Sequence, residues 1–458
     1  MKKISFHNLG CKVNTYELDA MAELFAKRGY QEVPWGEPAD VCVINTCSVT
    51  NIADRKSRQM LSKARKQSPD AIVIAVGCYV QTREEELLKN EGIDLCIGNN
   101  KKGQIVEILE EFLNSRDNSQ VIKEDAAVIV KDADMDKKYD DMSISKSTSH
   151  TRCFVKVQDG CNQFCSYCII PFARGRVRSR KQEDVIAEIK KLVENGFKEF
   201  VITGIHLSSY GSDFVYEKQK ADQFCPEKLL ELLEAINDIE GVERIRLGSL
   251  EPRIVTDEFT ARLSKIEKIC PHFHLSLQSG SAATLRRMNR HYTKEEYLAN
   301  CGILRKYFEH PAITTDVIVG FPGETEEEFI ESRDFLKEVD FYETHIFKYS
   351  KRQGTVAASM PGQLTEKVKS ERSDVLEELE KQMTRSFREY YIGKEEAVLF
   401  EEEKEIDGKT YMVGHTKEYV KVALEVGSEN ASTISANDIL MVNIEKFLTD
   451  EYMLGRIL

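Results

Sequence analysis

The chain has 458 residues and a net charge of −13, and its length suits about two to four domains. Hydrophobic residues make up 41% and charged residues 31%, as in ordinary soluble globular proteins. The acidic balance excludes a general polyanion binder, so a nucleic-acid ligand would need a local basic patch. No run of about 18 apolar residues occurs, and the first residues become polar too soon for a secretory signal. We expect a cytoplasmic protein with no membrane partner.

Twelve cysteines are many for such a chain. The reducing cytosol disfavours structural disulfides. Several cysteines are therefore expected to be metal ligands, catalytic thiols or small buried packing residues.

Residues 1–117 are predicted to form an open parallel-sheet α/β domain, because short apolar stretches alternate with helical patterns. The predicted strands are residues 3–9, 40–46, 71–77 and 94–98, and the predicted helices are residues 16–29, 51–67 and 83–90. The polar, serine-rich stretch 132–150 lacks this alternation, which predicts a linker over residues 118–148.

Residues 149–378 return to strand–helix alternation and are predicted to form a partial (β/α)6 barrel, whose active site would lie at the C-terminal strand ends. The predicted strands are residues 152–158, 199–204, 244–249, 272–278, 314–321 and 344–350. An amphipathic helix over residues 364–391 follows, and its end (379–393) connects to the last domain. Five short strands in residues 394–458 predict a small antiparallel β-barrel of OB type.

Three cysteines follow the first barrel strand in the segment GCNQFCSYC: Cys161, Cys165 and Cys168. Three thiolates on one loop can hold three irons of a cubane and leave the fourth iron open. An open iron can chelate S-adenosylmethionine, and one electron then cleaves it to a 5′-deoxyadenosyl radical. The alternatives are chance clustering or a zinc loop, but zinc usually needs a further Cys or His pair, and none has suitable spacing.

Cys11, Cys47 and Cys78 each follow a predicted strand of the N-terminal domain. C-terminal strand ends of an open α/β sheet converge on one crevice, so these residues form a plausible second thiolate triad. The alternative is that each is a small buried residue at a strand end. The remaining cysteines lack this placement and are predicted to be packing residues: Cys42, Cys96, Cys153, Cys225, Cys270 and Cys301.

Further candidates for cofactor binding lie in the cysteine loop and at the barrel strand ends. Tyr167 can pack on adenine, and Gly204 and Gly320 permit close backbone approach. Polar side chains at neighbouring strand ends can bind ribose hydroxyls and a carboxylate: Ser249, Glu251 and Gln278.

Basic residues gather near the same loops and fit a phosphate-bearing substrate, although solvated surface is the simpler interpretation of each. The candidate RNA contacts are Arg174, Arg176, Arg178, Arg180, Arg290 and Arg352. Residues 54–66 add a basic helix after Cys47. The last domain is acidic at residues 400–408, and Lys417, Tyr419 and Lys421 are its one usable face for RNA.

The segment GCNQFCSYCIIPFARGRVRSR (160–180) resembles the radical S-adenosylmethionine core of the methylthiotransferase family. LGCKVN, INTC and VGC resemble that family's auxiliary-cluster domain, and the C-terminal barrel resembles its TRAM domain. LGCKVNTYELDA (9–20), ITGIH (202–206) and YSKRQGTVAA (349–358) are most similar to the branch that methylthiolates N6-threonylcarbamoyladenosine beside the anticodon, at position 37 of tRNA. The acidic TRAM-like domain is a departure that puts its contribution to RNA affinity in doubt.

The resemblance implies two 4Fe–4S clusters and S-adenosylmethionine as both radical source and methyl donor. The Cys161/Cys165/Cys168 cluster would generate the radical, which would abstract hydrogen from C2 of the adenine. The Cys11/Cys47/Cys78 cluster would hold the sulfur to be inserted. The implied partners are a tRNA anticodon stem-loop, a reducing electron donor such as flavodoxin and a sulfur source.

Two kinds of alternative stay open. The same enzyme class could act on isopentenyladenosine in tRNA or on an aspartate of a ribosomal protein. A different class, a non-catalytic RNA-binding iron–sulfur protein, would not need the strand-end residues suited to S-adenosylmethionine.

Overall fold

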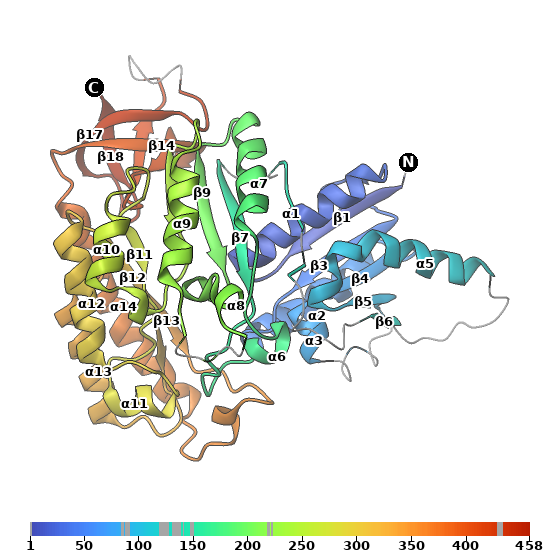
Figure 1. Cartoon of the computed structure of the whole chain (residues 1–458), viewed down its shortest axis with the longest axis horizontal. Helices are drawn as coiled ribbons and strands as arrows, with labels where there is room; N and C mark the ends of the chain where they lie inside the picture. The colour runs from blue at the N-terminus through green and yellow to red at the C-terminus, as the bar shows by residue number, and fades with distance from the viewer. Residues whose placement is uncertain are drawn as a thin grey trace.

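The computed structural model describes the chain except at residues 1, 84–86, 88–91, 119–127, 131–138, 141, 147–150, 218–219, 221–222 and 428–433. Within the described part it has three bodies: an N-terminal parallel sheet, a central barrel beside it, and a C-terminal barrel at one end of the central one (Figure 1). No helix in that part is long and apolar enough to cross a membrane.

The N-terminal sheet is parallel throughout, with the order β2-β1-β3-β4-β5-β6. Its strands are β1 (Lys3–Asn8), β2 (Gln31–Glu32), β3 (Val41–Thr46), β4 (Ile72–Gly77), β5 (Leu95–Ile97) and β6 (Val128–Val130). Every residue of β3 is buried, as expected for a central parallel strand covered on both faces. Its helices are α1 (Lys12–Lys27), α2 (Asn51–Gln67), α3 (Cys78–Thr82) and α5 (Ile105–Asn118), with the 3-10 turn η1 (Asn99–Gln104).

All four strands predicted for this domain are confirmed, and β2 and β6 are additions. The predicted helix over residues 83–90 lies mostly outside the described residues. The predicted linker is more structured than its composition indicates: it contributes β6, and it buries Met142 and Ile144 in the main core. Tyr16 of α1 donates a hydrogen bond of 2.6 Å to the Met142 carbonyl, so this segment fills the seam between the first two bodies.

The central barrel has six parallel strands in two hydrogen-bonded groups, and all six predicted strands are confirmed. They are β7 (Arg152–Asp159), β9 (Glu199–Gly204), β10 (Arg244–Leu247), β11 (His272–His274), β12 (Ala312–Val319) and β13 (Glu343–Lys348). The antiparallel β8 (Arg178–Ser179) extends the first group. Single bridges at Ile245–Ile269 and Leu250–Leu275 join the groups. The regular strand β11 ends at His274 and is therefore shorter than the predicted strand over residues 272–278.

Helices cover the outside of this barrel (Figure 1). The longer ones are α7 (Gln182–Glu194), α9 (Pro226–Asn237), α10 (Asp257–Leu263), α12 (Lys294–Tyr307), α13 (Glu326–Val339) and α14 (Glu366–Glu389). The shorter ones are α6 (Ile170–Arg174), α8 (Ser212–Val215) and α11 (Ala282–Arg287), with 3-10 turns η2 (Leu207–Ser209), η3 (Pro252–Ile254) and η4 (Val356–Ser359). Both α12 and α13 begin with a capping box, Thr293 with Glu296 and Thr325 with Glu328, which satisfies backbone donors that the first turn leaves unpaired.

The C-terminal body is the predicted small closed barrel, with the order β14-β15-β16-β18-β17. Its strand pairs are antiparallel as predicted, except that β16 and β18 pair in parallel. Its strands are β14 (Glu395–Ile406), β15 (Lys409–His415), β16 (Lys421–Glu425), β17 (Ile439–Phe447) and β18 (Met453–Ile457). It covers the strand-start end of the central barrel, where Arg244 donates to the carbonyls of His415 (3.0 Å) and Ala397 (2.6 Å). The opposite end, where parallel barrels place their active sites, is left to the cysteine loop.

A buried network of charged side chains joins the N-terminal body to the central barrel. Glu17 of α1 lies 2.7 Å from the Lys156 ammonium and 2.8 Å from the Arg174 guanidinium, both contributed by the central barrel. Lys102 of the N-terminal body binds the same carboxylate, and Asp159 shares Lys156 and Arg174. Burial favours the neutral form of Glu17, but Arg174, Lys102 and Lys156 together hold the pKa of this carboxyl well below its usual value.

Removing the Glu17 charge should therefore destabilise the protein strongly, because Lys102 would lose this carboxylate partner and Lys156 and Arg174 would keep only Asp159. We expect Glu17→Gln to cost about 3–5 kcal/mol, the range for breaking a buried ion pair. The thermal unfolding midpoint, measured anaerobically by calorimetry, tests this. Glu110→Gln is the matched control, since its ion pair with Arg28 is exposed and such pairs contribute about 0–1 kcal/mol.

The pH dependence has a defined sign. Because the folded-state pKa of Glu17 is depressed, its contribution is complete above the unfolded pKa and is lost as the pH falls through the folded value. The difference in midpoint between wild type and Glu17→Gln should accordingly shrink in acid. A difference that grows on acidification would contradict the charge network.

Candidate active site

The first cysteine triad lies on the loop that follows β7. Cys161 and Cys165 are buried, Cys168 is partly buried, and the charge on each thiolate would act on the other two. Gly160 allows the sharp turn into the loop: its φ is +73°, and a Cβ there would lie 1.9 Å from the Arg176 carbonyl oxygen. The backbone thus admits only glycine before Cys161.

The environment of this triad suits an anionic cluster. Burial raises the pKa of Cys161 to about 12, whereas the backbone N–H of Gln163 and the Arg290 charge act in the opposite direction. The Arg290 guanidinium donates to the Cys165 sulfur at 3.3 Å. Backbone and guanidinium donors aimed at sulfur are what iron-bound thiolates require.

The zinc alternative for this loop lacks support. A tetrahedral ion draws its donors close together. Among the described residues, the one group of three or more His, Cys, Asp or Glu donors lying within 4.8 Å of each other contains no cysteine. A cubane spaces its ligands more widely, so the loop fits the cluster better.

The second triad gathers at the C-terminal ends of three neighbouring strands. Cys11 caps α1 after β1, Cys47 follows β3, and Cys78 begins α3 after β4. Burial raises the pKa of Cys47 to about 12, and the thiolates of Cys78 and Cys11 would add to that shift. A Cβ on Gly10, whose φ is +114°, would lie 3.1 Å from the Cys47 sulfur. The sheet therefore places the three cysteines at one edge, and the missing side chain at Gly10 leaves room beside the Cys47 sulfur.

The two triads occupy adjoining faces of the first two bodies. Helix α3, which begins at Cys78, contacts α6, which follows Cys168 (Figure 1). The Asn99 amide bridges them: it donates to the Cys78 sulfur at 3.6 Å and to the Ala173 carbonyl at 2.7 Å. The six cysteines predicted to be packing residues are all buried.

The strand-end residues predicted to bind S-adenosylmethionine line the same end of the barrel. Tyr167 packs edge-on against Phe321 at 6.4 Å. Gly204 ends β9, where a Cβ would lie 2.8 Å from the Gln158 side-chain oxygen. Ser249 is exposed after β10.

Three more of these residues are held by their neighbours. Glu251 is buried and paired with Arg253 at 2.7 Å. Gln278 is buried with a left-handed φ of 70° and bridges to β12. The backbone N–H of Gly320 donates to the Glu324 carboxylate at 2.7 Å, which leaves its carbonyl oxygen, rather than the N–H, for any contact with adenine.

Most of the arginines predicted to contact RNA are not on the surface, so that prediction is wrong for four of the six. Arg174 pairs with Glu17 and Asp159, Arg178 donates to the Arg174 carbonyl, Arg180 pairs with Glu188, and Arg352 pairs with Asp54; all four arginines are buried. Each makes an internal contact, and the pairs Arg174–Glu17 and Arg352–Asp54 cross between the N-terminal body and the barrel.

The other two arginines differ from these. Arg176 is exposed beside the cluster loop, with its guanidinium 4.5 Å from the centre of the Phe164 ring. Arg290 is partly buried, and its guanidinium donates to the Cys165 sulfur of the cluster loop and to the Ser276 carbonyl. Arg176 alone of the six remains a surface candidate for a phosphate.

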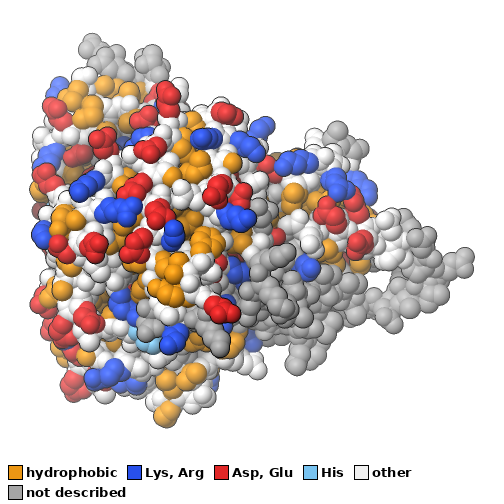
Figure 2. All heavy atoms as spheres, in the orientation of Figure 1, with side chains coloured by type: hydrophobic (Ala, Val, Ile, Leu, Met, Phe, Trp, Pro, Cys, Tyr) orange, Lys and Arg blue, Asp and Glu red, His pale blue; other side chains and the backbone are white. Residues whose placement is uncertain are grey.

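Helix α2 presents the basic surface that the sequence indicated. A shallow hollow on its outer face is lined by Arg55, Arg58, Gln59, Ser62, Lys63 and Lys66. The helix starts just after Cys47 and is capped by the Thr50 side chain, which accepts from the Ala53 N–H. By contrast, the helical face of the central barrel mixes acidic and basic side chains without a field of one sign (Figure 2).

The C-terminal barrel does not offer the face predicted for RNA. The Tyr419 ring lies 4.9 Å from Arg152 and 4.8 Å from Arg246 at the floor of the central barrel. Lys417 donates to the Glu267 carbonyl, and Lys421 pairs with Glu451. Tyr419 and Lys417 thus attach the small barrel to the large one, whereas the Lys421–Glu451 pair lies within the small barrel.

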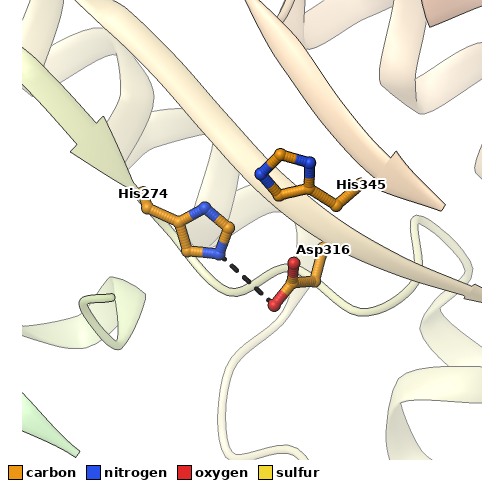
Figure 3. Close-up of side chains that lie close together, drawn as sticks. All are labelled: His274, Asp316 and His345. Carbon is orange, nitrogen blue, oxygen red and sulfur yellow. Dashed lines mark ion pairs between the residues drawn. The ribbon is translucent and has the colours of Figure 1, made fainter. Parts of the chain in front are cut away.

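Three polar side chains of the barrel strands were not identified from the sequence. His274, Asp316 and His345 come from β11, β12 and β13 and point toward one another (Figure 3). The His274 imidazole lies 3.3 Å from the Asp316 carboxylate and 3.0 Å from the Thr314 hydroxyl. Each of these residues stands alone within its strand, so their spacing in the sequence does not indicate a site. The parallel register of β11, β12 and β13 brings them together.

Lys12 was also not identified from the sequence. This residue follows Cys11 and begins α1. Burial is the first cause that lowers the pKa of its ammonium to about 8; Arg246 and Arg152 lower it further, and Asp316 and Cys11 oppose them.

Comparison with known proteins is consistent with this geometry. Residues 155–336 match the model of the radical SAM superfamily, and residues 3–98 match "Uncharacterized protein family UPF0004". The chain is 41% identical over 431 residues to threonylcarbamoyladenosine tRNA methylthiotransferase MtaB of Bacillus subtilis, across 94% of this chain and 92% of the relative. The Aquifex aeolicus protein of the same name is 40% identical, across 90% and 95%.

Two other matches widen the picture. A tRNA-2-methylthio-N(6)-dimethylallyladenosine synthase of Thermoanaerobacter is 38% identical across 87% of this chain and 83% of the relative. The solved structure of the radical S-adenosylmethionine methyltransferase TsrM of Kitasatospora setae, with cobalamin and a [4Fe-4S] cluster bound, superimposes with a TM-score of 0.58 at 16% identity, across 78% of this chain and 77% of that one. The latter match is a likeness of fold.

Iron content tests the two triads. After anaerobic reconstitution we expect about eight irons per wild-type chain, from two cubanes held by three thiolates each. Replacing either triad by alanines should leave about four. Cys301→Ala, at a buried cysteine in α12, should keep the wild-type content. Retention of all iron after loss of one triad would contradict the assignment.

The glycine before Cys161 gives an independent test that leaves every sulfur in place. Gly160→Ala must move the Arg176 carbonyl or the loop itself, so it should lower the iron content from about eight to about four per chain. Gly302→Ala in α12 is the matched control, because a Cβ there meets nothing within 4 Å. Equal iron in both variants would show that the loop tolerates a side chain.

Proposed function

Because this chain belongs to the methylthiotransferase family of radical S-adenosylmethionine enzymes, we propose that it converts N6-threonylcarbamoyladenosine at position 37 of tRNA to its 2-methylthio derivative. It is a tRNA methylthiotransferase, and its cofactors are two 4Fe–4S clusters and S-adenosylmethionine. The observation that carries the proposal is the pair of cysteine triads on adjoining faces of two bodies, in a chain that matches relatives of that name over nine-tenths of its length.

The residues divide the work between the two bodies. When bound, S-adenosylmethionine and the clusters supply the hydrogen-abstracting radical and the inserted sulfur. Cys161, Cys165 and Cys168 hold one cluster, and Arg290 balances the negative charge of that loop. Cys11, Cys47 and Cys78 hold the other. A purely polar side-chain reaction would not serve, because an aromatic C–H bond resists acid–base chemistry.

Further residues position S-adenosylmethionine. Tyr167 packs against Phe321 beside the cluster loop, and the Gly320 carbonyl is free of the Glu324 contact made by its N–H. Gln278 and Glu251 are buried polar groups whose backbones are fixed by β12 and η3. Held side chains of this kind place the cofactor with little loss of entropy at the time of reaction.

RNA would reach this end of the barrel along the basic face of α2, with Arg176 beside the cluster loop. Phosphate contacts of this type orient a nucleic acid without reading its sequence. We propose that the anticodon stem-loop binds there, that a reductant such as flavodoxin supplies electrons, that a separate source renews the sulfur, and that the enzyme works in the cytoplasm.

A second candidate substrate is isopentenyladenosine in tRNA, since a relative named for the dimethylallyl nucleoside is 38% identical. Mass spectrometry of tRNA nucleosides from a strain lacking the gene separates the two. We expect loss of the 2-methylthio form of threonylcarbamoyladenosine, accumulation of its unmodified precursor, and no change in the isopentenyl series. Loss of the isopentenyl derivative instead would transfer the proposal to that substrate.

The division of labour between the triads has its own test. A variant with Cys47→Ala should still cleave S-adenosylmethionine to 5′-deoxyadenosine under strong reduction but should form no methylthio product, because the first triad is intact. Cys165→Ala should lose both reactions. Complete loss of cleavage in Cys47→Ala, with four irons' worth of cluster still present, would refute the division.

A further inference from the structure

Three side chains on neighbouring strands of the central barrel have no part in the proposed reaction. In the parallel register, His274 of β11 pairs with Thr314 of β12, and Asp316, two residues further along β12, pairs with His345 of β13. Residues two apart on a strand point to the same side, so these side chains project together. Figure 3 shows His274, Asp316 and His345 turned toward one another.

Their potential metal-binding atoms lie nearly as close together as a single ion requires. One such atom from each residue lies within 4.8 Å of the other two, and the His274 Nε2 atom lies 3.3 Å from an Asp316 carboxylate oxygen. Zinc–ligand bonds of about 2.0–2.2 Å place tetrahedral ligand atoms about 3.3–3.6 Å apart. The His274–Asp316 pair already has this spacing, and the exposed His345 side chain can close the remaining distance by a small rotation.

The His274 ring has the second contact that orients metal-binding histidines. Its Nδ1 atom lies 3.0 Å from the Thr314 hydroxyl, and a histidine that binds a metal ion through one nitrogen almost always donates the other N–H to a neighbouring acceptor. With the proton on Nδ1, the Nε2 atom carries the lone pair that binds a metal ion. This Nε2 atom is buried and has no hydrogen-bond partner among the described residues.

A proton is the alternative to a metal ion between His274 and Asp316. A protonated imidazole donates its N–H to a carboxylate at about 2.7–3.2 Å, with the N–H pointing at the oxygen. The observed contact is 3.3 Å long and is not a hydrogen bond. The nitrogen and the carboxylate oxygen therefore approach each other as two ligands of one cation do, rather than as donor and acceptor.

We propose that His274, Asp316 and His345 bind a divalent transition-metal ion of the zinc class, at a site separate from both cysteine triads. Two imidazoles and one carboxylate are ligands that suit Zn²⁺, and the group contains no cysteine. Three protein ligands leave a fourth position for water or for an oxygen atom of a bound molecule. This inference goes beyond the proposed function and does not depend on which nucleoside the enzyme modifies.

The test measures zinc and iron together in the anaerobically reconstituted protein, after equilibrium dialysis against a zinc buffer. We expect about one zinc per wild-type chain beside about eight irons, from one three-ligand site and two cubanes. Asp316→Asn and His345→Ala each remove one ligand, so each should weaken zinc binding at least about tenfold. Iron content should keep its wild-type value in both variants, which shows that they fold and hold their clusters.

Two further variants separate the site from general effects of charge. Thr314→Val removes the hydroxyl beside the His274 Nδ1 atom and should weaken zinc binding about 10–100-fold, the effect of losing such a contact behind a metal ligand. Asp257→Asn is the matched control, because that carboxylate is exposed and pairs with Lys306 at 2.6 Å. The control should bind zinc as the wild type does.

X-ray absorption at the zinc edge identifies the ligands directly. We expect nitrogen and oxygen atoms at about 2.0–2.2 Å and no sulfur at about 2.3 Å. Sulfur among the zinc ligands would show that the ion has entered a cysteine triad and would overturn the proposal. A wild-type protein without zinc, or equal zinc binding in the wild type, Asp316→Asn and His345→Ala, would also overturn it.

Discussion

The arrangement of this protein depends on the buried ion pairs between α1 and the central barrel. Two carboxylates, Glu17 and Asp159, lie among Lys102, Lys156 and Arg174, and all five side chains are almost completely removed from solvent. Taking charges out of water is costly, so such a network contributes less to stability than an apolar interface of the same size would. What the network provides is a fixed relative position of the two bodies. Its short hydrogen bonds hold α1, and with it Cys11 at the start of that helix, at one position relative to the cysteine loop.

The same principle appears at the other contacts between bodies. Arg352 joins the barrel to Asp54 of α2, close to Cys47. At the opposite end, Glu199 binds Arg246 at 2.8 Å and His415 of the small barrel at 3.1 Å. Burial disfavours the charged form of Glu199, but Arg246 and His415 hold the pKa of its carboxyl well below the usual value. The small barrel thus acts first as a floor for the large one, and its strand β14 takes part in that contact through Glu401, which pairs with Arg152 at 3.0 Å.

The elements were predictable where the chemistry repeats along the chain. Strand–helix alternation gave every barrel strand, and the placement of Cys11, Cys47 and Cys78 after successive strands gave a triad, because parallel strands end at one edge. The prediction that these arginines contact RNA failed for a physical reason. The sequence of residues 173–181 is the same whether its basic side chains contact phosphate or pair with buried carboxylates, so the sequence alone does not distinguish these two cases. Glu17, which neutralises Arg174, lies on α1, far away in the sequence, and Glu188, which neutralises Arg180, lies on the next helix, α7. The sequence analysis did not identify His274, because only the parallel register of β11, β12 and β13 brings it beside Asp316 and His345.

Sequestering these arginines resolves the conflict between an acidic chain and an RNA substrate. Positive charge that looked available for phosphate at Arg174, Arg178, Arg180 and Arg352 is neutralised inside, so the affinity for polyanions must come from exposed basic groups such as those on α2 and Arg176. A limited basic surface gives weak, salt-sensitive binding to the backbone. Selection among tRNAs must then come from the nucleotide that enters the barrel. An enzyme that attacks an unactivated C–H bond gains from weak binding of the RNA backbone, because an RNA without the right base can then dissociate before radical cleavage begins.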